Sequence, residues 1–310
     1  MVFGESKLKD VYRKLVWGPY REALERSPWG WEYRVNRRVG RVASYFTAGK
    51  LGEVEENLRR AFPDRQDLRG VARETMGTHF VNQYASFAFG RINRDNWRSY
   101  LRFEGYEHVE AARAAGKGLV LLHPHMGPAQ LPLCVLGVLG HSVNQIGGGE
   151  PAVEKSETGR WATEMRHTLE ARMPVKLHVG GSYLRGLLRA LQQGEIVLTA
   201  ADGTGGGTEI GRRLTRTVLG QSMGVPVGGF YMALRAKVAL HPLHTVRDPE
   251  QRGRYLSVIG PPAPLRTDLP LEQALEAGAD WTAAYLERVL SAHPGEWHFW
   301  DGFAPGGILS

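Results

Sequence analysis

The residues best suited to catalysis follow the apolar segment 118–122, where His123 and His125 precede Gln130. A short run of Leu and Val bounded by glycine and proline predicts a strand buried on both faces. In open α/β sheets, ligands bind beyond the carboxyl ends of such strands. Because imidazole changes its charge near neutral pH, His125 is a candidate general base at that edge.

The interval of five residues between His125 and Gln130 has a geometric consequence. If His125 lies in a loop just before a helix, residue 130 can reach the imidazole Nδ1 and leave Nε2 for the substrate. The Gln130 amide oxygen would fix the tautomer without adding charge. A carboxylate from another segment, such as Asp202 or Glu150, is an alternative partner for the same nitrogen.

Further polar residues are candidate substrate contacts because they follow predicted strands. Asp202 and a glycine-rich segment come after the predicted strand 195–200, which places a carboxylate at the same sheet edge as His125. Glu150 follows three glycines after the strand-like run 142–146, as a loop over the site would. Guanidinium groups close to the glycine-rich segment are suited to binding phosphate. The candidates for substrate binding are His123, Glu150, Asp202, Arg212, Arg213 and Arg216.

The spacing of apolar residues predicts an α/β protein. Residues 51–91 have helical periodicity, interrupted at Pro63-Asp64. Later strand-like runs alternate with helical patterns, which favours a mostly parallel sheet flanked by helices. We expect an N-terminal helical region over 1–100 and an α/β core over 101–310, together forming one structural domain. The predicted strands are 118–122, 142–146, 175–178, 195–200, 216–219, 238–245 and 255–259.

Composition restricts the partners and the compartment. The 310 residues include 39 Lys and Arg against 32 Asp and Glu, so an acidic partner such as a carrier protein or an anionic lipid is expected. No nucleic-acid reading motif accompanies this charge. The single cysteine, Cys134, excludes an internal disulfide, and its helical apolar surroundings suit a core residue rather than a nucleophile. No metal-ligand spacing is recognisable, so we expect no metal cofactor.

The first 46 residues predict contact with a membrane surface or, equally, an ordinary helical cover of the core. They contain ten Lys and Arg interleaved with Trp, Tyr and Phe. No run approaches the roughly 18 apolar residues of a spanning helix, and the order of segments in a signal peptide is missing. We therefore expect a cytoplasmic protein, with the inner face of the cytoplasmic membrane as a candidate peripheral location.

Several segments together resemble the bacterial late lipid A acyltransferases, which belong to the lysophospholipid-acyltransferase-like enzymes. Their His-x4-Asp/Glu motif is present here as His125-Met-Gly-Pro-Ala-Gln130. Residues 56–63 resemble the family's Asn-Leu and Phe-Pro segment, and 103–118 resemble the lead into its first core strand. Residues 187–203 look like the second core strand with its acidic loop. The likeness extends from about residue 50 to the end of the chain.

The resemblance implies a glycerol-3-phosphate acyltransferase-like fold and transfer of an acyl group. In such an enzyme, His125 would act as general base on an acceptor hydroxyl or amine, with residue 130 in the acid's place. The donor would be a thioester of acyl carrier protein or coenzyme A, and no cofactor would be needed. The implied acceptor is a lipid, a glycolipid or a specialised metabolite. The oligomeric state is left open by the sequence.

Two other functions compete with this interpretation. Gly220-Gln-Ser222-Met-Gly224 matches the nucleophile elbow of α/β-hydrolases, and with Asp248 and His293 it would give a serine esterase. The glutamine at position 130 also permits a non-catalytic homologue that binds acyl groups or lipids. Separate substitutions of Ser222 and His125 would discriminate the esterase from the acyltransferase.

Overall fold

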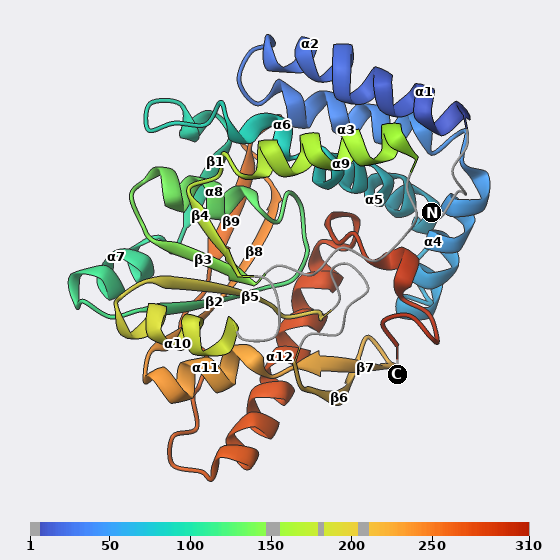
Figure 1. Cartoon of the computed structure of the whole chain (residues 1–310). Helices are drawn as coiled ribbons and strands as arrows, with labels where there is room; N and C mark the ends of the chain where they lie inside the picture. The colour runs from blue at the N-terminus through green and yellow to red at the C-terminus, as the bar shows by residue number, and fades with distance from the viewer. Residues whose placement is uncertain (1–6, 147–155, 179–182, 204–210, 310) are drawn as a thin grey trace.

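The protein is built around a seven-stranded sheet with helices on both faces (Figure 1). The computed structural model describes residues 7–146, 156–178, 183–203 and 211–309. The strand order is β1-β9-β8-β2-β5-β3-β4, which is mostly parallel as expected. The strands of the sheet are β1 (Leu101–Glu104), β2 (Leu119–His123), β3 (Val143–Ile146), β4 (Val175–His178), β5 (Ile196–Ala200), β8 (Ala239–Arg247) and β9 (Tyr255–Ile259).

The central strand β2 is buried along its whole length, as a continuous apolar run in a parallel sheet should be. It lies between β5 and β8, and both neighbours run parallel to it. In this register His123 stands opposite Ala200, so β2 and β5 end side by side. The loops that carry His125 and Asp202 therefore emerge at the same edge of the sheet.

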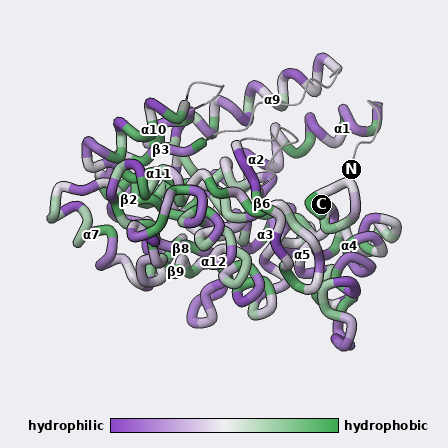
Figure 2. The backbone as a smooth tube through the Cα atoms, turned by 90° about the horizontal axis from the view of Figure 1, so that it is seen from below, coloured by the Kyte–Doolittle hydropathy of each residue, from purple (hydrophilic) through white to green (hydrophobic). Residues whose placement is uncertain are grey.

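Helices cover both faces of the sheet and divide its core into layers. Leu119 and Leu121 pack with residues of α8 on one face, whereas Val120 and Leu122 pack with α10, α11 and α12 on the other. Figure 2 shows the apolar segments gathered around β2 and α11. The helices after β1 are α7 (Glu107–Ala114), α8 (Leu131–Val138), α9 (Glu157–Glu170), α10 (Tyr183–Gln192), α11 (Gly228–Ala236) and α12 (Leu271–Ala292).

The part of the chain before β1 is helical, and it shares a core with the sheet. Tyr33 and Val81 from these helices pack in one cluster with Leu101 and Tyr255 from β1 and β9. This cluster holds the N-terminal region against the edge of the sheet. The helices of this region are α1 (Lys7–Leu15), α2 (Arg21–Glu25), α3 (Trp31–Ala43), α4 (Ala48–Ala61), α5 (Leu68–Gln83) and α6 (Ser86–Phe89).

Three features of the sheet differ from the sequence-based expectation. The predicted strand 216–219 belongs to β6 (Arg213–Val218), which pairs only with β7 (Gln221–Pro226) in a separate antiparallel hairpin. The short strand β1 has too few residues to give a clear pattern and was not predicted. Strand β9 returns antiparallel to β8 after a turn, so β9 and β1 run antiparallel to the other strands.

No helix among the described residues is long and apolar enough to span a bilayer.

Candidate active site

His125 lies in the loop between β2 and α8, at the carboxyl edge of the sheet. Gly127 makes this loop possible because its φ of 55° lies in the left-handed region. A Cβ at Gly127 would stand 2.9 Å from the backbone oxygen of Thr245 in β8. Any larger residue would push the loop away from the sheet and displace His125.

The imidazole of His125 is held by Asp202 and not by Gln130. Its Nδ1 lies 2.7 Å from Oδ1 of Asp202, and the backbone N–H of His125 donates to Oδ2 at 2.7 Å. Because an ionised carboxylate can only accept, Nδ1 carries the proton and Nε2 has its lone pair free. The side chain of His125 is 20% exposed, whereas that of Asp202 is fully buried.

Trp297 completes the surroundings of Asp202. The buried indole N–H donates to Oδ2 of the carboxylate at 2.8 Å. Burial by itself raises the pKa of Asp202, but Coulombic attraction to His125 and the hydrogen bonds from His125 and Trp297 outweigh it. The pKa of Asp202 therefore lies well below its usual value, and the group is ionised at neutral pH.

Uncharged aromatic groups line the other sides of the imidazole. The rings of Phe299, His123 and His298 have their centroids 4.7, 5.2 and 5.5 Å from that of His125. Burial, with repulsion from His125, lowers the pKa of His123 to about 3 and that of His298 well below its ordinary value. At neutral pH both neighbours are uncharged, so Asp202 is the charge that faces His125 directly.

The C-terminal segment 294–299 builds one wall of this site, which the sequence interpretation missed. Met126 pairs with Trp297 in an antiparallel bridge, and the N–H of Gly127 donates to the backbone oxygen of Glu296 at 2.8 Å. The N–H of His298 donates to the oxygen of His125 at 3.3 Å. The concentration of aromatic residues in Trp297-His-Phe-Trp300 was the available signal. Nothing in the sequence indicates that this segment reaches position 125.

Gln130 is not in contact with the imidazole nitrogen for which it was predicted. It stands immediately before α8, and its side chain has no hydrogen bond to any residue that the structure describes. The Gly127 turn directs His125 toward the end of β5, where Asp202 already lies. The expected geometry of the five-residue interval is therefore wrong, and the alternative partner Asp202 occupies the position.

The three arginines predicted near Asp202 are in different environments. The Arg213 guanidinium donates from Nη2 to the Gly203 oxygen at 3.0 Å, next to Asp202. Arg212 pairs with Glu272, and Arg216 pairs with Glu276 and Asp280, all on α12. Only Arg213 is thus placed beside the loop of the carboxylate. Glu150 falls outside the described residues.

The hydrolase motif does not form a nucleophile elbow. Ser222 lies exposed within β7, opposite Thr217 of the same hairpin, and no strand-turn-helix is built around it. Asp248 is engaged by Arg254 at 2.5 Å and Arg102 at 3.4 Å. His293 stacks on His244. The proposed Ser, Asp and His therefore do not form a hydrogen-bonded triad.

Cys134 lies in the environment of a core residue and not in that of a nucleophile. Cys134 is buried in α8, and burial raises the pKa of its thiol to about 12, so it is protonated and unreactive at neutral pH. Among the residues described, no group of three or more His, Cys, Asp and Glu could hold a metal ion.

The fold and the site together define an α/β protein with a hydrogen-bonded imidazole-carboxylate pair at the carboxyl edge of its parallel strands. The model of the bacterial lipid A biosynthesis acyltransferase family matches residues 22–301. The chain therefore belongs to this family and is an acyltransferase that acts on a lipid. A search of curated proteins finds no match.

Proposed function

We propose that the protein transfers an acyl group from a thioester of acyl carrier protein or coenzyme A to a hydroxyl of a lipid or glycolipid, with His125 as general base. The observation that carries this proposal is the hydrogen bond between Nδ1 of His125 and the buried Asp202 carboxylate. It leaves Nε2 as the acceptor for the proton of the attacking hydroxyl.

In the proposed reaction, Nε2 of His125 takes the hydroxyl proton while the oxygen attacks the thioester carbonyl. The C–S bond then breaks, and the proton passes to the departing thiolate. Asp202 stabilises the imidazolium formed during this step, and its attraction is strong because the carboxylate is buried. Neutral His123 and His298 add no repulsion. These proton-transfer and acyl-transfer steps require no metal or redox cofactor.

The negative charge that develops on the thioester oxygen needs a donor. The N–H groups of Met126 and Gly127 are already bonded to the Pro124 and Glu296 oxygens. Arg213 is a suitable cation because its guanidinium reaches the backbone of Gly203, beside Asp202. We assign Arg213 to this role, and we assign no substrate contact to Arg212 and Arg216, since acids of α12 engage them.

We further propose that the protein works at an anionic membrane surface on the cytoplasmic side. Ten of the twelve exposed large hydrophobic side chains among the described residues fall between Leu8 and Phe46. The same segment carries nine Lys and Arg, which would attract acidic lipid headgroups. The exposed fractions of Leu8 and Phe46 reach 80% and 84%, which is unusual for side chains of this size.

The proposal is tested by incubating the protein with acyl thioesters of carrier protein and coenzyme A together with a panel of acceptor lipids, following both products by mass. We expect His125→Ala to abolish transfer and Ser222→Ala to leave it unchanged. Activity that survives in His125→Ala but disappears in Ser222→Ala would instead support an esterase. A folded wild-type protein that binds acyl thioesters without transferring the acyl group would support a non-catalytic homologue.

A further inference from the structure

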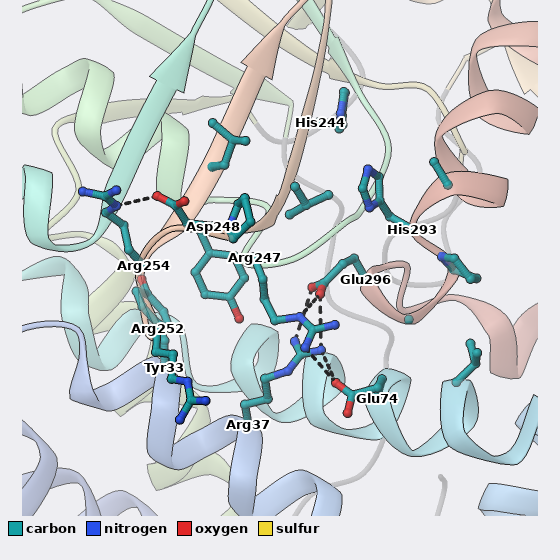
Figure 3. A pocket seen from close by; sticks show the side chains of 18 of the residues that line it. Tyr33, Arg37, Glu74, His244, Arg247, Asp248, Arg252, Arg254, His293 and Glu296 are labelled. Carbon is teal, nitrogen blue, oxygen red and sulfur yellow. Dashed lines mark hydrogen bonds and ion pairs between the residues drawn. The ribbon is translucent and has the colours of Figure 1, made fainter. Parts of the chain in front are cut away.

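A cavity of about 1100 Å³ lies on the other side of segment 294–299 from the catalytic pair. It is open to solvent on one side and bordered by α3, the beginning of α5, the end of β8 and the turn before β9 (Figure 3). Neither His125 nor Asp202 lines it. Eight arginines and five carboxylates contribute to its wall. The arginines are Arg34, Arg37, Arg38, Arg41, Arg65, Arg247, Arg252 and Arg254.

One part of the wall is a closed ionic network that stabilises the fold. Arg37 is nearly buried, and its Nη2 lies 2.6 Å from Glu74 and 3.2 Å from Glu296. Arg247 contacts the same two carboxylates, and Arg41 pairs with Glu74 at 3.0 Å. Figure 3 shows Arg37 between the two acids. These charges satisfy one another and are not available to a ligand.

The other part of the wall has cations without acidic partners. Arg34, Arg38 and Arg252 form no ion pair with any carboxylate in the described part of the chain. Arg34 rests on Gly253, where a Cβ would come within 2.4 Å of its side-chain carbons, so the turn and α3 are packed closely here. Three like charges around a concave surface repel one another, and an anion between them would relieve that repulsion.

We propose that this cavity binds the phosphorylated headgroup of a membrane lipid. Guanidinium groups match phosphate oxygens in geometry and charge, and a phosphomonoester supplies several acceptors at once. The volume is ample for a phosphate attached to a polar headgroup. The exposed Arg38 and Arg252 and the half-buried Arg34, with Arg37 and its acids beside them, would hold the anion.

The position of α3 identifies a lipid as the source of the phosphate. Arg34, Arg38 and Arg41 of this helix line the cavity, while Val39 and Val42 are exposed on the same helix and Tyr45 and Phe46 directly follow it. A headgroup can therefore enter while these apolar side chains contact the acyl region. This assignment rests on the proposed membrane contact, whereas phosphate binding itself does not.

Binding of phosphate is tested with inorganic pyrophosphate by titration calorimetry, and binding of lipid by sedimentation with vesicles of phosphatidylcholine and phosphatidic acid. Vesicles in which phosphatidylglycerol supplies the same total charge serve as the comparison. We expect Arg34→Gln combined with Arg252→Gln to weaken binding of both phosphate probes roughly tenfold, since it removes two charge-assisted contacts. The matched control is Arg59→Gln combined with Arg235→Gln, which removes two exposed cations outside the cavity.

Three results would overturn the inference. Equal binding of both phosphate probes by the cavity variant and the wild type would exclude the cavity. Binding of adenosine 3′,5′-bisphosphate without preference for phosphatidic acid over phosphatidylglycerol would assign the cavity to a nucleotide instead of a lipid. If the control pair of substitutions weakened binding of the phosphate probes as much as the cavity pair does, the effect would come from net charge and not from the cavity.

The folded His125→Ala variant separates this inference from the proposed reaction. We expect it to bind pyrophosphate and phosphatidic acid as the wild type does, because His125 does not line the cavity. Acyl transfer that survives in this variant would contradict the proposed reaction and leave the phosphate site intact. Loss of phosphate binding in a folded His125→Ala protein would contradict the separation of the two sites.

Discussion

The catalytic pair and the arginine cavity lie on opposite sides of segment 294–299, and their charged groups are in opposite environments. Asp202 is fully buried and receives hydrogen bonds from His125 and Trp297. In the cavity, Arg38 and Arg252 are exposed and have no acidic partner in the described structure. Glu296 faces the cavity side and Trp297 the catalytic side, one residue apart.

This difference follows from the cost of burying charge. A carboxylate removed from water must be matched by donors, so each atom around Asp202 has a defined partner and the geometry is fixed. Exposed guanidinium groups stay hydrated when no ligand is bound and remain available to bind one. The catalytic side is therefore built for orientation of one proton acceptor, and the cavity is built for binding of an anion.

The largest effect is expected from Asp202→Asn, which keeps the shape but removes the charge. The amide cannot hold the imidazole tautomer and stabilise the imidazolium, so kcat should fall about 10³-fold or more. Steady-state transfer assays measure this, and pyrophosphate binding should be unchanged because the cavity is separate. A loss of less than tenfold in a folded variant would contradict the importance of the pair.

Acidification is expected to destabilise the catalytic side because burial lowers the pKa values of His123 and His298 and keeps both uncharged at neutral pH. The unfolded chain takes up a proton at His123 near pH 6.5, whereas the folded protein resists until about pH 3. The contribution of His123 to the free energy of unfolding therefore falls by about 1.4 kcal/mol per pH unit as the pH drops below 6.5. The depressed pKa of Asp202 acts only below its ordinary value of 3.8, outside this range.

Urea unfolding between about pH 7 and pH 5 measures this dependence. We expect His123→Gln to flatten the slope by about one proton, although other buried histidines, such as His244, contribute slopes of the same sign. A slope identical to that of the wild type would show that His123 is protonated in the folded protein. The arginines of the cavity should add nothing to the slope, because guanidinium groups stay charged throughout.

A smaller effect is expected from Trp297→Phe, which removes the indole N–H that binds Asp202. Loss of one hydrogen bond to a charged group should lower kcat roughly tenfold through a less firmly held carboxylate. The matched control is Trp300→Phe, because its buried indole N–H donates to the Pro294 oxygen at 2.7 Å and not to Asp202. Both variants should lose stability, and an equal loss of kcat in both would assign Trp297 to packing alone.

The smallest effect is expected from Gln130→Glu, which restores the acid of the family motif. Because Asp202 already occupies Nδ1 of His125, a carboxylate at position 130 should change kcat by less than about threefold. Transfer assays beside Gln130→Ala measure this. A tenfold gain would show that residue 130 approaches the imidazole during the reaction.

The sequence indicated the main elements of the fold and the principal catalytic candidate. Six of the seven predicted strands correspond to strands of the sheet. The signal is clearest for β2 and β5, whose apolar runs are buried between parallel neighbours. The segment 216–219 was also extended, but local pattern could not show that it pairs in a separate hairpin.

The partner of His125 could not be chosen from local spacing. Gln130 is five residues away along the chain and makes no contact with Nδ1, whereas Asp202, 77 residues away, makes two hydrogen bonds to His125. The register of β2 against β5 brings these loops together. Trp297 was missed for the same reason, since its importance depends on a neighbour distant in the sequence.

The amino-acid sequence by itself determined the class of fold, the position of His125 at the end of a buried strand and the basic, aromatic character of the N-terminal region. These properties depend on short-range periodicity and composition. The tertiary structure decided that Asp202 orients the imidazole and that α3 and the β8–β9 turn enclose an arginine cavity. Such pairings depend on strand order and on the packing of segments far apart in the chain, which no local pattern specifies.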